Sequence, residues 1–256
     1  MMVRSWMVAA ISLGALAAWA PATPLISKQY RLELKTSVAQ DLSALGQGEQ
    51  KQEFSNTAFV TVTTADSAGG QTVTMVLDSL IPGEGSPIPP EAATGVGGQK
   101  WHGFRHATGK VGGLKLEGER QIAGAIEPAL LDLLPPMKLG TRAGQSWTDT
   151  TDTDNNGIAV RMVTNFQTSA DSYNGAKVIK LAGAFSSAMS GQQESPQGTL
   201  TLEGNGTGTN TWLVGADGLS LSATHSANQN ISVSMAQLPQ PIPVTVQTQG
   251  SATLIK

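Results

Sequence analysis

Residues 219–235 read LSLSATHSANQNISVSM, and this stretch decides the fold class. Apolar side chains occupy only odd positions, which also hold His225 and Gln229, whereas every even position is polar. A β-strand places alternate side chains on opposite faces of a sheet, so this spacing gives one apolar face and one wet face. In a helix the same residues would scatter around the circumference. We therefore predict a long strand over 219–235 whose odd positions, Leu221 among them, point to the interior.

The same alternation recurs along most of the chain, and turn-forming dipeptides separate the alternating segments. Asn156-Gly157, Asn174-Gly175 and Asp217-Gly218 each lie between two such segments, and these dipeptides tolerate the positive φ of a tight hairpin. The pattern predicts a mainly β protein with a large curved antiparallel sheet of about 11 strands, a half-barrel or an open barrel. The expected strands lie near 28–40, 48–65, 71–81, 99–108, 113–121, 145–153, 157–171, 176–188, 197–214, 219–235 and 243–255.

One short helix is expected at 127–134, where Glu127-Pro128 precedes a leucine-rich run and proline suits the first helical turn. It joins two strand sets, 23–122 and 142–256, which we take as parts of a single β-rich domain over 23–256. A helix in that place is expected to plug an open end or an edge of the sheet. Residues 82–98 form a Pro/Gly-rich loop, which is either a functional lid or an ordinary surface loop.

Residues 1–22 have the features of a cleaved secretory signal peptide. Arg4 supplies the positive charge, and the apolar run from Trp6 to Ala18 follows. Two cleavage sites of small residues come next: Ala18-Trp19-Ala20 would leave Pro21 first, and Ala20-Pro21-Ala22, the better site, would leave Thr23 first. The apolar run is shorter than the roughly 20 residues that a membrane span needs. No cysteine follows it, so we do not expect a lipoprotein. The sequence predicts a periplasmic or secreted protein with no transmembrane span in the mature chain.

Composition excludes several classes of function. Lys and Arg total 16 against 19 Asp and Glu, which argues against a nucleic-acid partner. The chain has no cysteine, so disulfides, thiol catalysis and cysteine-ligated zinc are excluded. We found neither a Gly-x-Ser-x-Gly nucleophile motif nor a phosphate-binding glycine loop, and we expect neither catalytic residues nor a cofactor.

A resemblance rests on three fragments of the C-terminal half. These are Gly140-Thr-Arg-Ala-Gly144-Gln-Ser-Trp147, Tyr173-Asn-Gly175 and the glycine-punctuated hairpin up to Gly218-Leu219. The pattern resembles exported bacterial proteins of unknown function that have large curved antiparallel sheets. Lipoprotein-carrier-like half-barrels have a similar plan, in which a short helix closes a curved sheet. The resemblance implies an architecture and carries over no functional residue.

Five side chains are candidates for ligand binding: Trp101, Phe104, Trp212, His225 and Gln229. His225 lies on the apolar face of the 219–235 strand, where an imidazole without a partner would be costly. It is either a core histidine bonded to Gln229 or to backbone, or a polar group in an otherwise apolar cavity. The cluster around Trp101 and Phe104 is either a ligand-contacting aromatic patch or ordinary strand packing.

A histidine pair and a carboxylate-rich turn each suggest a metal site, but their spacing argues against metal binding. His102 and His106 share a strand face but lie about 13 Å apart, too far for one zinc ion. Asp152-Thr-Asp154-Asn-Asn156-Gly157 matches the first half of a calcium loop, yet Val163 stands where an EF-hand needs its closing glutamate. We read this segment as a polar hairpin turn rather than as a calcium site.

These features favour a non-enzymatic protein of the bacterial cell envelope that binds a lipid or another apolar small molecule in a cavity of its sheet. The alternative is a structural or adhesive β-sandwich of the envelope without a small ligand. An outer-membrane barrel fits less well, because such barrels carry aromatic girdles and aromatic residues make up only 5% of this chain.

Overall fold

The computed structural model describes residues 25–118, 126–155, 157–195, 198–235 and 240–256. The expected signal peptide therefore lies outside the described residues. Eleven strands within these ranges form one antiparallel sheet, as the alternation predicts. They are β1 (Ile26–Asp41), β2 (Glu49–Ser67), β3 (Gly70–Pro82), β4 (Lys100–His106), β5 (Val111–Glu117), β6 (Ser146–Asn155), β7 (Ile158–Tyr173), β8 (Ala176–Ser195), β9 (Gly198–Val214), β10 (Ser220–Met235) and β11 (Ile242–Leu254).

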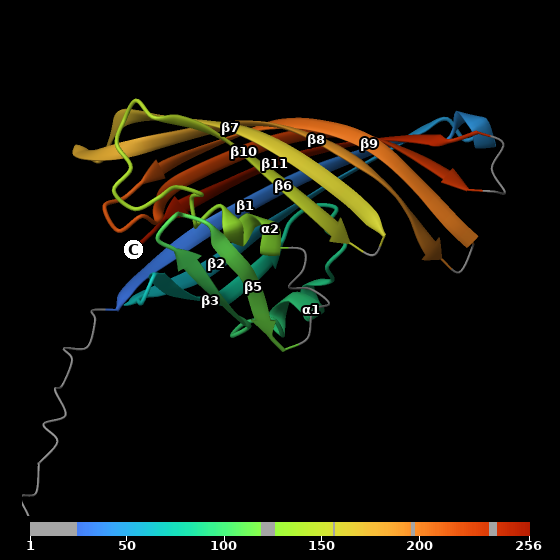
Figure 1. Ribbon diagram of the computed structural model, residues 1–256. Coiled ribbons are helices and arrows are strands. Elements are labelled where there is room, and N and C mark those ends of the chain that lie inside the picture. The colour runs from blue at the N-terminus through green and yellow to red at the C-terminus, as the bar shows by residue number, and fades with distance from the viewer. Residues whose placement is uncertain (1–24, 119–125, 156, 196–197, 236–239) are drawn as a thin grey trace, which may run out of the picture.

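The first and last strands are neighbours in the middle of the sheet. The spatial order is β5-β4-β3-β2-β1-β11-β10-β9-β8-β7-β6, and Tyr30 of β1 faces Leu254 of β11 in the register. The two predicted strand sets thus form the two halves of one continuous sheet (Figure 1). The edge strands β5 and β6 belong to different halves and do not pair with each other.

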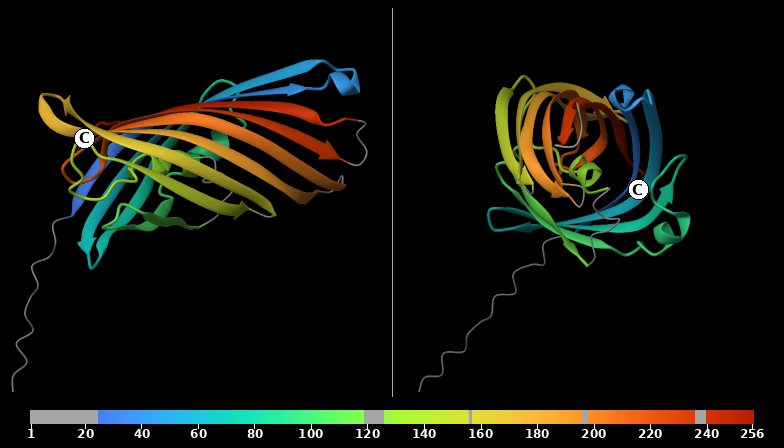
Figure 2. Two further views of the ribbon diagram at one scale, coloured as in Figure 1. Left: turned by 45° about the horizontal axis from the view of Figure 1, so that its top comes forward. Right: turned by 90° about the vertical axis from the view of Figure 1, so that its right-hand side faces the viewer.

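The sheet is strongly curved, and its concave face surrounds a short helix, α2 (Glu127–Leu131). The end-on view shows strands of both halves around this helix (Figure 2). This arrangement confirms a large curved antiparallel sheet that does not close into a barrel. We call the face toward α2 the inner face of the sheet and the opposite face the outer face.

The helical content differs from the expectation in two ways. The helix expected at 127–134 ends at Leu131, although Leu133 and Leu134 beyond it are buried. The 82–98 segment contains a second short helix, α1 (Pro90–Thr94), which has proline in its first turn and buries Ala93. The expectation of a single helix was therefore wrong. A 3-10 turn follows β1 at Ser43–Leu45. No helix among the described residues has the length and apolar character needed to cross a membrane.

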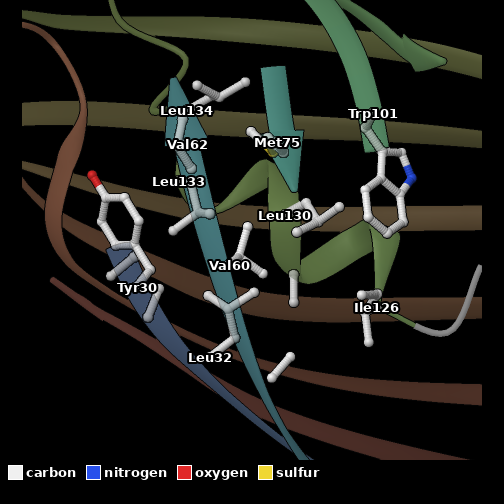
Figure 3. Packing of buried hydrophobic residues seen from close by; sticks show 14 of the residues in the cluster. Tyr30, Leu32, Val60, Val62, Met75, Trp101, Ile126, Leu130, Leu133 and Leu134 are labelled. Carbon is white, nitrogen blue, oxygen red and sulfur yellow. The ribbon is translucent and has the colours of Figure 1, made fainter. Parts of the chain in front are cut away.

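The core lies on the inner face of both halves of the sheet, and its densest part is between α2 and the first half. Leu130, Leu133 and Leu134 are almost completely buried there (Figure 3). Tyr30 and Leu32 of β1 meet them from the sheet, as do residues of the next three strands: Val60, Val62, Met75 and Trp101. The leucine-rich segment 127–134, which we call the plug, therefore packs on the concave face near the middle of the sheet and not at an edge strand.

The alternation in β10 starts later than the sequence suggests. The pairing of β10 with β9 is irregular between Ser220 and Ser222, so an extra residue shifts the register there. Ser220 is fully buried and Leu221 only half-buried, the reverse of the prediction for these two residues. From Ala223 to Asn230 the odd positions are the more buried ones, as predicted, whereas residues 231–235 are all half-buried.

Glycines on the inner face make room for rings on neighbouring strands. Phe166 faces Gly183 and Phe185 faces Gly208 in the register of β7–β9, and His225 faces Gly250 between β10 and β11. A Cβ at Gly208 or Gly250 would overlap the ring opposite it, and one at Gly183 would be in tight contact. Glycine therefore lets a ring lie across the adjacent backbone at these positions.

Candidate functional site

Asp132 and His225 form a partly buried pair beneath the plug. Asp132 caps the C-terminus of α2, and its Oδ2 lies 2.5 Å from Nδ1 of His225 on β10. The two side chains are only 14% and 15% exposed. Ser220 Oγ donates to the backbone carbonyl of Asp132 at 2.7 Å. The expectation that His225 bonds to Gln229 or to backbone was therefore wrong, because the partner is a carboxylate from the plug.

Arg105 of β4 fixes the chain that follows α2. Its Nη1 donates to the carbonyl of Gly218, and its Nη2 donates to the carbonyls of Pro135 and Met137, at 2.7 to 3.2 Å. The side chain is 1% exposed. Burial lowers the pKa of this guanidinium, and the Asp217 carboxylate partly offsets that effect. Arg105 thus joins one half of the sheet to the plug and to the β9–β10 turn.

Asp217 carries a second set of interactions at the same turn. Its Oδ2 lies 2.6 Å from Nζ of Lys28, and its Oδ1 accepts a hydrogen bond from the backbone N–H of Leu219. Nearby, the Tyr30 hydroxyl donates to the carbonyl of Ser220 at 2.8 Å. Burial raises the pKa of Tyr30 well above its ordinary value, and the negative charge of Asp217 raises it further. These bonds fix the β9–β10 turn against β1.

A hollow of about 710 Å³ lies beside this anchored chain. One wall is the segment 137–141 that follows the plug, and the other is formed by the ends of β7, β8 and β9. The apolar lining side chains of the inner face come from both walls: Met137, Leu139, Ala170, Ile179 and Val214. Ile179 and Val214 are partners in the register of β8 and β9. We call this space the hairpin hollow, because the β7–β8 hairpin closes one side of it.

Two charged residues border the hairpin hollow, Lys177 and Asp171. Lys177 is two residues before Ile179 on β8, so both side chains lie on the inner face. Asp171 alternates with Ala170 and Ser172 on β7 and therefore points to the outer face. Its Oδ1 accepts a hydrogen bond from the N–H of Ser172. The positive charge of Lys177 is thus the one directed toward the apolar lining.

Two of the predicted ligand residues are buried in the core. Trp101 is 0% exposed and lies beside Ile126 and Leu130 (Figure 3). Trp212 is 4% exposed, and its ring centroid lies 6.3 Å from that of Phe166. The indole Nε1 of each tryptophan has no hydrogen-bond partner among the described residues. The structure therefore accounts for both side chains by packing.

The other three predicted residues do not form one patch with the tryptophans. Phe104 pairs with exposed Thr72 on the outer face and packs edge-on against His106, so it lies on the other side of β4 from Trp101. Gln229 is on the inner face, where its side chain lies over Gly206. The proposal that the five residues contact a ligand stays a prediction.

The inner face continues beyond the plug as an apolar strip toward the Met235 end of β10. Half-buried apolar side chains from five adjacent strands lie there, and we call them the distal strip: Ile158, Val160, Met189, Leu202, Ile231, Val233, Ile242 and Val244. The residues that pair with Ala227 across β7–β11 mark the start of this region. From there to the Met235 end of β10, all side chains on the inner face of β7–β11 are uncharged.

The side chains of the possible metal sites lie apart. His102 is on the outer face of β4, where Nδ1 lies 3.2 Å from Thr74 Oγ1 and Nε2 lies 3.2 Å from Glu117 Oε2. Asp154 Oδ1 accepts a hydrogen bond from the N–H of Gly157, as in a hairpin turn. Within the described part of the chain, no three histidine or carboxylate side chains gather to hold a metal ion.

The roles of several residues in this region were not predicted from the sequence. Asp132 interrupts a run of leucines, which is an available signal for a polar contact inside the core. Arg105 has the same parity as Trp101, so the alternation alone places it on the inner face. No such signal exists for Lys177, because the hairpin hollow arises only when the 137–141 segment folds back over β8.

No protein-family model matches the sequence, and no curated protein matches it. Function must therefore be argued from the geometry of the inner face.

Proposed function

We propose that this chain is an exported protein of the bacterial cell envelope that binds a hydrophobic small molecule on the inner face of its sheet. The observation that carries the proposal is the hairpin hollow, whose two opposing walls are both lined by apolar side chains. Its volume of about 710 Å³ lies within the usual range of roughly 300–1,000 Å³ for ligand pockets.

Hydrogen bonds from Arg105 keep one wall of the hairpin hollow in place, which supports ligand binding there. Arg105 bonds to the carbonyls of Pro135 and Met137 and so fixes the start of the 137–141 wall. Leu139 remains 37% exposed in that wall. A preformed apolar surface of this kind gains free energy when a ligand removes it from water, without the cost of ordering the wall first.

The chemistry of the inner face favours a binding protein over an enzyme. An aspartate–histidine pair is part of many hydrolytic sites, but such sites also need a nucleophile on the second ring nitrogen. Among the described residues, no hydroxyl bonds to Nε2 of His225. The pair instead attaches α2 to β10. We therefore propose no catalytic role for Asp132 or His225.

Export is the second part of the proposal, and it rests on residues 1–22. The apolar run and the small residues before Thr23 are typical of a signal peptide. Expression of the full chain in a Gram-negative host should give a periplasmic protein that begins at Thr23 or Pro21. N-terminal sequencing checks this, and a periplasmic or secreted protein that retains Met1 would contradict cleavage.

Binding is tested with the purified mature protein and a fluorescent apolar probe, with native mass spectrometry for any lipid that co-purifies. We expect saturable probe binding that Leu139→Asp weakens by about tenfold or more, since a charge would then face the apolar lining. Leu131→Asp is the matched control, because Leu131 is 45% exposed on α2 and lies outside the hairpin hollow. Absence of both probe binding and a lipid adduct would leave the structural or adhesive role.

A further inference from the structure

We infer that the hairpin hollow binds a long-chain carboxylate, with the acyl chain between its apolar walls and the carboxylate at Lys177. This inference rests on the proposed function and specifies its ligand. The first step is the apolar part of the site. Ile179 and Val214 form one wall, and Met137 and Leu139 form the other.

The second step is the cation at the border of this surface. Lys177 and Ile179 are two residues apart on one strand face, so their Cα atoms lie about 6.6 Å apart. Lys177 is exposed, and no carboxylate among the described residues forms an ion pair with it. Asp171 lies on the outer face by the alternation of β7, and it forms no ion pair with Lys177. A single positive charge at the end of an apolar hollow is complementary to an anionic head group on an apolar chain.

The third step concerns hydrogen bonding at the same position. Ser172 of β7 faces Lys177 of β8 in the register, and both lie on the inner face. A carboxylate at this point can accept from the lysine ammonium and from the serine hydroxyl together. The volume of the hollow suits one drug-sized molecule, which favours a ligand with one chain over a lipid with several.

Charge also distinguishes the hairpin hollow from the distal strip. The strip is apolar as well, but the inner positions around it on β7–β11 are uncharged. It offers nothing that would select a head group. A ligand with a carboxylate is therefore expected at Lys177 and not beyond the plug.

The test compares three ligands of equal chain length by calorimetric titration of the mature protein at neutral pH. They are dodecanoate, dodecanol and dodecyltrimethylammonium, each below its micelle concentration. We expect the protein to bind dodecanoate most tightly. Lys177→Glu should weaken dodecanoate binding about tenfold, since it removes one partly exposed attraction and adds a repulsion.

The matched control is Lys180→Glu, which makes the same charge change on the outer face of the same strand. It should bind dodecanoate like the wild type. Equal effects of the two variants, or equal affinity for all three ligands, would overturn the carboxylate inference and leave the proposed function standing. Weaker binding in Ile231→Asp together with unchanged binding in Lys177→Glu would move the ligand to the distal strip and also overturn the inference. If none of the three ligands binds, the carboxylate inference is overturned. If the fluorescent apolar probe also fails to bind, the proposed function is overturned as well.

Discussion

His225 and Asp132 are 93 residues apart in the sequence, yet Nδ1 of the histidine lies 2.5 Å from Oδ2 of the aspartate. The contact joins β10 to the C-terminus of α2 and so attaches the plug to the second half of the sheet. Arg105 makes the corresponding attachment to the first half. Apolar packing alone has no fixed direction. We therefore expect these polar contacts to determine where the plug lies on the inner face.

Gly250 should be required for this pair. A Cβ at Gly250 would overlap the His225 ring, and the glycine itself has no left-handed φ that would disfavour alanine. Gly250→Ala should therefore displace the imidazole from Asp132 and lower the free energy of unfolding by about 1–3 kcal/mol. Urea denaturation measures the change.

The same substitution in a His225→Ala background is the control. With the ring gone, Gly250→Ala should change stability by less than about 0.5 kcal/mol, as ordinary substitutions do. If Gly250→Ala costs the same in both backgrounds, the ring is not the reason for glycine at this position. A double-mutant cycle of this kind isolates the coupling between the two sites.

Ala223 and Thr224 should respond oppositely to a charge. Ala223 is 2% exposed on the inner face of β10, while Thr224 is exposed on the outer face. Ala223→Asp should destabilise the protein by several kcal/mol, because a buried carboxylate there has no partner. Thr224→Asp should change stability by less than about 0.5 kcal/mol. Denaturant melts decide the matter, and greater damage from Thr224→Asp would mean that the faces are assigned the wrong way round.

Calcium should make no contribution to stability through the β6–β7 turn. Asp154 Oδ1 already accepts a hydrogen bond from the backbone N–H of Gly157. Asp152 lies opposite Arg161, and its side chain is 69% exposed. The segment also lacks the closing glutamate of a calcium loop. A chelator should leave the melting temperature unchanged. A drop of several degrees would show that the carboxylates bind the ion after all.

Local sequence patterns were sufficient for the strands and insufficient for their junctions. The alternation in 223–230 assigned faces correctly because side-chain direction in a strand depends only on parity. It failed at Leu221, because an irregular pairing shifts the parity and leaves no mark in the residue types. The 82–98 segment looked like a loop because its prolines and glycines hide a helix of five residues.

The candidate site was harder to predict for a different reason. The partner of His225 could not be predicted, since the plug folds back from a position 93 residues away and no local rule covers that distance. The hairpin hollow likewise depends on how the 137–141 segment lies over β8. The aromatic residues chosen from the sequence turned out to be packed in the core or on the outer face, because aromatic side chains serve packing as well as binding.

Tyr30 makes the last prediction, which concerns stability at high pH. Its hydroxyl donates to the Ser220 carbonyl in a buried position, and burial raises its pKa well above the ordinary value of about 10. The unfolded chain loses the tyrosine proton near pH 10, whereas the folded protein keeps it. Stability from Tyr30 is therefore fully present below about pH 10 and is lost as the pH rises above that value.

Tyr30→Phe separates this effect from general alkaline denaturation. At neutral pH the variant should lose about 1 kcal/mol, because the Ser220 carbonyl keeps no hydroxyl donor. Above about pH 10 its stability should fall less steeply than that of the wild type, since phenylalanine has no proton to lose. Tyr173→Phe is the control, because Tyr173 is the other tyrosine and lies at the end of β7. Equal slopes of unfolding free energy against pH in the wild type and Tyr30→Phe would show that Tyr30 ionises no less readily in the folded protein than in the unfolded chain.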